Sequence, residues 1–209
     1  MTVFLRRAAE TAAAKVEQQA DNSAVKYIER YEDLYIEKDY SLRVNKTIRL
    51  VCVKGPLCCL TTGWTSNDVP ATIDEVGFEV SALPRSISAF GLLLKDQPER
   101  KEVVVGLLPP VKNKNAFSLE IVWTWPRWWT ALRMHGRDRV VVEPLSAVKK
   151  LRVRLFCHKK VCIDGHPGVL AVNPDVGSTT SPTDAGSYIV HDWTYHNAPA
   201  RRYELTFSF

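Results

Sequence analysis

The sequence predicts an all-β fold: a mainly antiparallel β-sandwich, immunoglobulin-like or jelly-roll in connectivity, preceded by an N-terminal α-helix. Apolar and polar residues alternate over most of the chain after residue 33, which is the period of a strand with one buried face. Clusters of Pro, Gly, Asn and Asp interrupt these runs roughly every ten to fifteen residues, as turns do in a sandwich. Hydrophobic residues make up 45% of the chain, which is enough for a sizeable core.

The N-terminal helix is predicted from residues 2–20, which are rich in Ala, Glu, Gln, Lys and Arg. Apolar residues recur there at helical spacing: Leu5, Ala8, Ala12 and Val16. The next stretch, AVKYIERYEDLYIE, fits both a helix and a strand, and we favour a helix to about Arg30 followed by a strand. We therefore divide the chain into an N-terminal helical segment, 1–32, and a β-sandwich domain, 33–209. The apolar stripe of the first segment must be covered by the β domain or by another chain.

The β domain is predicted to open with a hairpin, in which residues 34–36 and 42–52 flank a turn at 38–41. The clearest core strand is 116–125, because five large apolar residues alternate on one of its faces. Further strands are predicted at 57–62, 72–80, 87–95, 102–108, 138–143, 149–157, 187–195 and 202–209. Residues 173–186 are rich in Pro, Gly, Ser, Thr and Asp, so we expect a surface loop there.

Composition limits the classes of function. The chain has 28 Lys and Arg against 23 Asp and Glu, a net charge of +5 that permits an anionic partner without requiring one. No apolar run approaches the length of about eighteen residues that a membrane span needs, and the N-terminus lacks the apolar core of a secretory signal. The 5 cysteines lie mostly inside apolar patterns, as buried thiols do in a reducing compartment. We expect a cytoplasmic protein without a cofactor.

Two tryptophans beyond the core strand are interface candidates. Pro126 has no N–H and ends the ladder pairing, and Trp128 and Trp129 follow it. Together with Arg127 and Arg133 they are of the types that dominate protein-interface hot spots or stack on a base or sugar. The alternative, which we favour, is that both indoles fold back onto the core.

A basic strand is the candidate site for an anion or a nucleic acid. Alternation places its basic side chains and one aromatic ring on the same face, opposite an apolar face. These residues are Lys150, Arg152, Arg154, Phe156, His158 and Lys160. Charged side chains on an exposed strand also prevent edge-to-edge aggregation, so a solvated face is the simpler interpretation.

A metal site is a weaker candidate. Cys157, Cys162 and His166 are residue types that bind zinc, but their spacing matches no short zinc-binding hairpin. Cys157 also shares a face with Leu155 and Val153, which favours a buried thiol.

A thiol nucleophile is equally weak. Cys58 or Cys59, with His191 or His196 and with Asp192, would supply the residue types of a thiol catalyst. Most chains of this size contain such a trio, and no nucleophile elbow, phosphate-binding loop or zinc-protease helix motif is present in the sequence.

The leading functional hypothesis is a non-catalytic protein-interaction or assembly module. Its helix would pair with a protein partner or a second copy, and the face that bears Trp128 and Trp129 would meet a protein. The alternative is a nucleic-acid-associated or coat-like β-protein that uses the basic strand. The third hypothesis is a small Cys/His or metal-dependent hydrolase.

Overall fold

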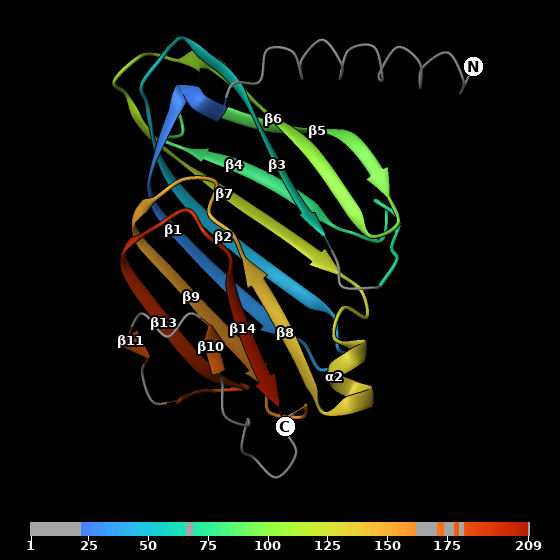
Figure 1. Cartoon of the computed structure of the whole chain (residues 1–209). Coiled ribbons are helices and arrows are strands. Elements are labelled where there is room, and N and C mark those ends of the chain that lie inside the picture. Colours follow the sequence, from blue (N-terminus) through green and yellow to red (C-terminus); the bar gives the residue numbers. More distant parts are fainter. Residues whose placement is uncertain (1–21, 66–68, 162–170, 174–177, 180–181, 209) are drawn as a thin grey trace, which may run out of the picture.

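The protein is mostly β, with its strands arranged in several sheets (Figure 1). This computed structural model describes the chain over residues 22–65, 69–161, 171–173, 178–179 and 182–208. The predicted helix over residues 2–20 lies outside the described residues, and the chain enters the fold through a 3-10 turn, η1 (Asn22–Ala24).

The largest sheet has eight strands and runs through the whole molecule (Figure 1). Its strand order is β11-β13-β9-β1-β2-β7-β4, and β12 pairs with β13. Neighbouring strands are antiparallel except β1 and β9, which are parallel. The bounds are β1 (Val25–Ile36), β2 (Leu42–Cys52), β4 (Phe78–Leu83), β7 (Ala116–Trp125), β9 (Val148–His158), β11 (Ser178–Thr179), β12 (Thr183–Ala185) and β13 (Tyr188–Ala198).

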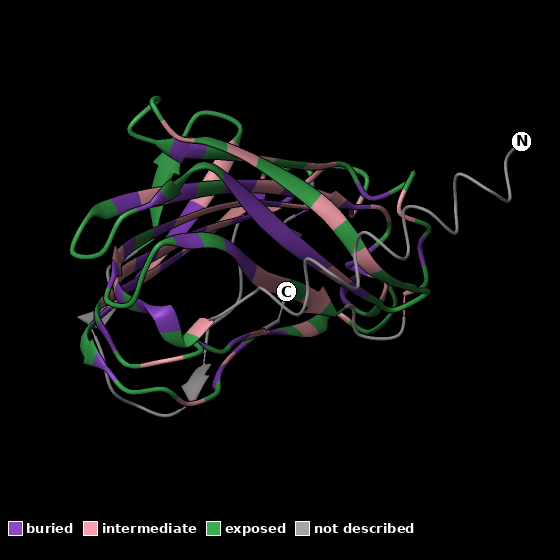
Figure 2. Ribbon diagram, turned by 90° about the horizontal axis from the view of Figure 1, so that it is seen from above, coloured by how far each residue is buried: buried purple, intermediate pink, exposed green. Residues whose placement is uncertain are grey.

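Two three-stranded sheets cover the same face of the large sheet, with orders β3-β6-β5 and β10-β14-β8. Their strands are β3 (Leu57–Thr65), β5 (Ser88–Gln97), β6 (Arg100–Val111), β8 (Arg137–Val142), β10 (Ala171–Asn173) and β14 (Tyr203–Ser208). Trp64 of β3 stacks on Trp123 of β7 at 5.4 Å between ring centroids, and Tyr203 of β14 lies 4.9 Å from Tyr195 of β13. Buried residues follow the strands between the sheets, whereas exposed residues gather on the connecting turns (Figure 2).

One short α-helix, α2 (Thr130–His135), leads into β8 and ends at Gly136. Gly136 adopts a left-handed backbone, φ 66°, which a residue without a Cβ adopts readily. No helix in the described part of the chain is long and apolar enough to cross a membrane.

Strand β1 corrects the predicted secondary structure, because the helix expected to continue to about Arg30 is a strand from Val25 onward. A bulge at Ile28 separates two stretches of regular alternation. Tyr27 points to the core before the bulge, and Arg30 and Glu32 point to the core after it. The bulge changes which alternate residues face the core, and two of the core-facing residues are charged. Apolar residues therefore do not alternate along β1, and the sequence does not show the period of a strand.

The other strand predictions agree with the structure to different degrees. The strand 116–125 is confirmed with the same bounds as β7, and the hairpin at residues 34–52 is confirmed as β1 and β2. The strand expected at 72–80 begins only at Phe78, because Thr72 and Glu75 close a turn through the Thr72 amide and the Glu75 carboxylate. The loop expected at 173–186 is wrong in part, because β11 and β12 lie within it.

Three charges cluster on the core face of β1 and β2: the buried Arg30 and Glu32, and the half-buried Lys46. Arg30 donates from Nε to Glu32 Oε1 at 2.6 Å and from Nη1 to the Glu143 carbonyl at 2.8 Å. Lys46 Nζ lies 3.7 Å from Glu32 Oε1 and its side chain is 14% exposed. Burial opposes ionisation of Glu32, but Arg30 and Lys46 together hold its pKa below the usual value. Burial, and then Arg30, lower the pKa of Lys46 to about 8.

Replacing Lys46 with Met is expected to change how stability depends on pH. An unfolded lysine has a pKa of about 10.4, so between the native value of about 8 and that value the unfolded chain binds more protons. The stability difference between wild type and Lys46→Met should therefore move in favour of wild type as pH rises through this window, by up to about 3 kcal/mol. Urea unfolding of both proteins between about pH 7 and pH 10.5 measures it; a difference that stays constant with pH would contradict the buried position of Lys46.

Candidate protein-interaction groove

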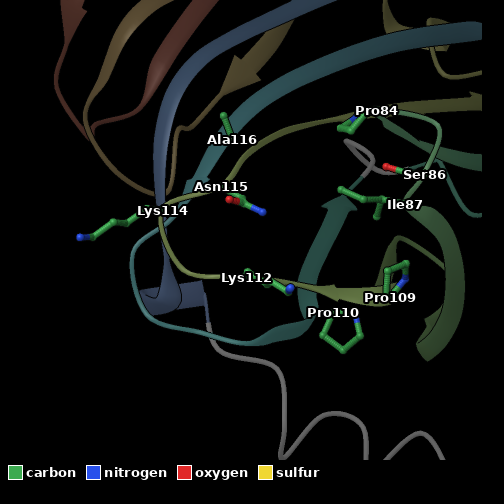
Figure 3. A pocket seen from close by; sticks show the side chains of 9 residues that line it. All are labelled: Pro84, Ser86, Ile87, Pro109, Pro110, Lys112, Lys114, Asn115 and Ala116. Carbon is green, nitrogen blue, oxygen red and sulfur yellow. The ribbon is translucent and has the colours of Figure 1, made fainter.

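A groove of about 450 Å³ lies at the end of the molecule where two turns meet (Figure 3). One turn joins β4 to β5 and the other joins β6 to β7. The lining residues are Pro84, Ser86 and Ile87 from the first turn, and Pro109, Pro110, Lys112, Lys114, Asn115 and Ala116 from the end of β6 and the second turn. The groove is therefore built from segments that are about 25 residues apart in sequence.

Hydrogen bonds of the main chain fix both turns. The Ile87 amide donates to the Pro84 carbonyl at 3.0 Å, and the Asn115 amide donates to the Lys112 carbonyl at 3.1 Å. The Lys114 amide donates to the Cys52 carbonyl at 2.7 Å, which ties the second turn to the end of β2. Lys114 has a positive φ of 67°, the backbone that lets the turn reverse direction. Backbone hydrogen bonds thus hold both turns, and Ile87 also packs against the core.

The walls of the groove are mainly apolar. Pro84 and Ile87 lie on one side, and Pro109 and Pro110 lie opposite them (Figure 3). The proline rings present apolar surface, and proline has no backbone N–H to donate to a ligand. Two exposed leucines precede lining prolines in the sequence: Leu83, before Pro84, is 41% exposed and Leu108, before Pro109, is 57% exposed.

The polar lining residues carry only one sign of charge. Lys112 lies beside Pro110, and Lys114 extends away from the walls into open space (Figure 3). Ser86 and Asn115 add neutral hydrogen-bonding groups, and the lining has no carboxylate among its described residues. The groove thus combines apolar walls with two lysines and no acidic side chain among its described lining residues.

A second groove, of about 550 Å³, lies between α2 and the pair β8 and β14. Its lining includes Arg137, Arg139, Asp138 and Glu204, and Arg139 Nη1 lies 3.3 Å from Glu204 Oε1. The opposite charges compensate one another, so the lining of this groove has a smaller charge imbalance than that of the first.

The structure places Trp128 and Trp129 in the core. Trp128 is 8% exposed and its ring lies 5.5 Å from that of Trp125, while Trp129 is fully buried. The Trp129 amide donates to the Tyr40 carbonyl at 3.0 Å. Neither indole forms an exposed anchor, so Arg127 and Arg133 are the exposed members of the predicted interface group. Arg127 lies 3.8 Å from Glu75, and Arg133 lies over the Tyr40 ring at 5.8 Å.

The basic strand forms β9, and alternation places Lys150, Arg152, Arg154, Phe156 and His158 on the face away from the core. Arg152 binds Asp192 of β13, and Arg154 binds Asp33 of β1 through two hydrogen bonds, with Nε to Oδ1 at 2.7 Å.

The other members of that group have neighbours of different kinds. Phe156 stacks on Tyr35 at 4.3 Å, the His158 ring lies 5.4 Å from that of Tyr188, and Lys150 lies over Tyr31 at 5.7 Å. Lys160 lies past the end of β9, in an exposed turn, and so does not share the face predicted for it. Cross-strand partners therefore neutralise the two arginines on which the predicted anion site depended.

The predicted metal residues are placed only in part. Cys157 is buried on the core face of β9, and Cys162 and His166 lie outside the described residues. Within the described ranges, no three His, Cys, Asp or Glu side chains gather closely enough to hold a metal ion.

The predicted thiol trio is divided between sheets. Cys58 and Cys59 belong to β3, whereas His191, Asp192 and His196 belong to β13. Burial raises the pKa of Cys59 and lowers that of His191, so both favour their neutral forms. Asp192 is bound by Arg152 on the face opposite the buried His191, so it cannot orient that imidazole.

Similarity to known proteins is confined to structure. No family model matches the sequence, and no curated protein matches it. A candidate protease from Parabacteroides distasonis has a TM-score of 0.58 at 12% identity, with 90% of this chain and 41% of that chain covered. An M1 zinc metallopeptidase from Deinococcus radiodurans has a TM-score of 0.56 at 10% identity, with 90% and 43% covered. Yeast LTA4 hydrolase has a TM-score of 0.50 at 9% identity, with 90% and 29% covered.

These similarities establish a shared fold and nothing further. This chain spans less than half the length of each of those three proteins. Its similarity to them therefore concerns a part of each.

Breaking the pair between Arg154 and Asp33 is expected to reduce stability. Arg154→Ala should lower the free energy of unfolding by about 1 kcal/mol, because the pair is bidentate but its side chains are partly exposed, at 34% and 19%. Asp33→Ala should lower it by a similar amount, and the double variant by less than the sum, since both changes remove one interaction. Urea unfolding of the four proteins gives the coupling; strictly additive effects would show that the two side chains do not interact in solution.

Proposed function

We propose that this chain is a non-catalytic protein-interaction module that binds a protein partner or a second copy through the groove at the β4–β5 and β6–β7 turns. The observation that carries the proposal is a groove with proline and isoleucine walls, next to which the chain exposes Leu83 and Leu108, the residues before two of the lining prolines. Large apolar side chains exposed beside a groove are typical of surfaces that bind other proteins. For the fold, we propose a sandwich in which the two small sheets form the layer opposite the large one.

The solved structures bear on the fold of the module alone. In each of them the matched part is a fraction of a longer chain, so a fold of this type occurs beside further protein. A peptidase activity is not proposed here, because an identity of 9–12% carries the fold alone. The two predicted alternatives, a nucleic-acid-associated protein and a hydrolase, stay predictions.

Replacing Leu108 with Asp is expected to weaken the proposed interaction without unfolding the protein. The side chain is 57% exposed, so the free energy of unfolding should change by no more than about 0.5 kcal/mol. A charge in place of an apolar contact should weaken association with the partner or second copy by at least about tenfold. Light scattering of the full chain over a concentration series measures self-association, and quantitative crosslinking in host lysate measures a partner.

Leu145→Asp is the matched control. Leu145 is 63% exposed and lies between β8 and β9, outside the lining of the groove. Its variant should behave like wild type in both measurements. A wild-type chain that stays monomeric and crosslinks to nothing, or an equal loss in both variants, would contradict the proposal.

A further inference from the structure

The groove lies at an end of the molecule where the chain carries positive charge without negative charge. The lining residues lie within 84–87 and 109–116, and these two segments contain Arg85, Lys112 and Lys114 and no Asp or Glu. The adjoining turn between β2 and β3, residues 53–56, adds Lys54 and again no acid. Gly55 of that turn packs against the second lining turn, where an added Cβ would lie 3.0 Å from the Asn113 amide nitrogen. Three neighbouring turns are therefore basic.

These cations differ from those on the large sheet. Arg85, Lys112 and Lys114 are all exposed, and none forms an ion pair with another residue in the part of the chain that the structure describes. Arg152 and Arg154 each hold a carboxylate from a neighbouring strand. The charge at the groove is thus available to a partner, whereas the two arginines of β9 are paired within the chain.

We propose that the groove takes an extended acidic segment of a partner protein, an inference that rests on the proposed interaction function and names its ligand. An apolar side chain of the segment packs between Pro84 with Ile87 and Pro109 with Pro110. Carboxylates on either side of that residue meet Lys112 at the groove and Lys114 or Arg85 at its rim. Ser86 and Asn115 supply hydrogen-bonding groups for the backbone of the segment.

A polypeptide suits this groove better than a nucleic acid does. Sites that bind single-stranded nucleic acid combine basic side chains with aromatic rings on which bases stack. Among the described residues that line the groove there is no aromatic side chain, and its walls are proline and isoleucine. Apolar walls beside unpaired cations fit a chain in which Leu or Val alternates with Asp or Glu.

A random heptapeptide display library, selected on the full-length protein, tests the composition of the ligand without assuming a sequence. Peptides that bind wild type should be enriched in Asp and Glu around an apolar residue. Selection on Lys112→Glu/Lys114→Glu should lose that enrichment. Selection on Lys149→Glu/Lys160→Glu, which reverses one exposed lysine at each end of β9 and none that lines the groove, should retain it.

Affinity measurements then separate the contribution of charge to peptide binding from that of shape. The best peptide is compared with its isostere, in which Asn and Gln replace Asp and Glu, by fluorescence polarisation with the full-length protein. The isostere and the Lys112→Glu/Lys114→Glu variant should each weaken binding by about tenfold or more. Raising NaCl from about 0.05 M to about 0.5 M should weaken wild-type binding and leave binding of the isostere nearly unchanged.

The outcomes distinguish the two proposals. Selected peptides that are neutral or basic but sensitive to Leu108→Asp would overturn the acidic ligand and leave the interaction groove standing. Peptides insensitive to both Leu108→Asp and Lys112→Glu/Lys114→Glu, or no binding peptides at all, would overturn both. A single-stranded oligonucleotide that binds more tightly than the best peptide, and loses that binding in Lys112→Glu/Lys114→Glu, would overturn the acidic ligand in favour of a nucleic acid.

Discussion

The buried ion pair between Arg30 and Glu32 is the constraint on which the central part of the fold depends. Both residues lie on the core face of β1, which pairs with β2 on one side and β9 on the other. A buried charge without a partner destabilises a protein by several kcal/mol, so every contact of this pair matters. Lys46 of β2 lies opposite Glu32 in the register, and the Glu143 carbonyl after β8 accepts from Arg30. One charge cluster thereby connects β1, β2 and the segment that follows β8.

The same pair explains where sequence patterns predict this fold and where they do not. In β7 the core residues are all large and apolar, so alternation predicts both its existence and its bounds. In β1 the core face carries Arg30 and Glu32, and a bulge at Ile28 shifts the alternation by one residue. The remaining apolar residues, such as Tyr27, Tyr31 and Leu34, then fall at helical spacing. Polar burial is decided by partners in other strands, which no local pattern contains.

The candidate sites follow the same rule. Sequence alternation correctly places Arg152 and Arg154 on an outer face, but their partners are Asp192 and Asp33, 40 and 121 residues away in the chain. The groove was missed because its prolines mark strand ends when each segment is considered alone. The one signal that could have found it is the absence of Asp and Glu from residues 103–119 together with 80–94.

Charge is therefore used in three ways in this chain. In the core, Arg30 and Lys46 are held by Glu32, and the cluster orders the strands. On the outer face of the large sheet, arginine and aspartate pairs cross between strands and leave little net field. At the groove, Lys112 and Lys114 are among the lining residues and no carboxylate is. These two lysines are part of the chain's excess of Lys and Arg over Asp and Glu. Water can solvate these cations; the acidic segment that we propose would pair with them and also cover the proline walls.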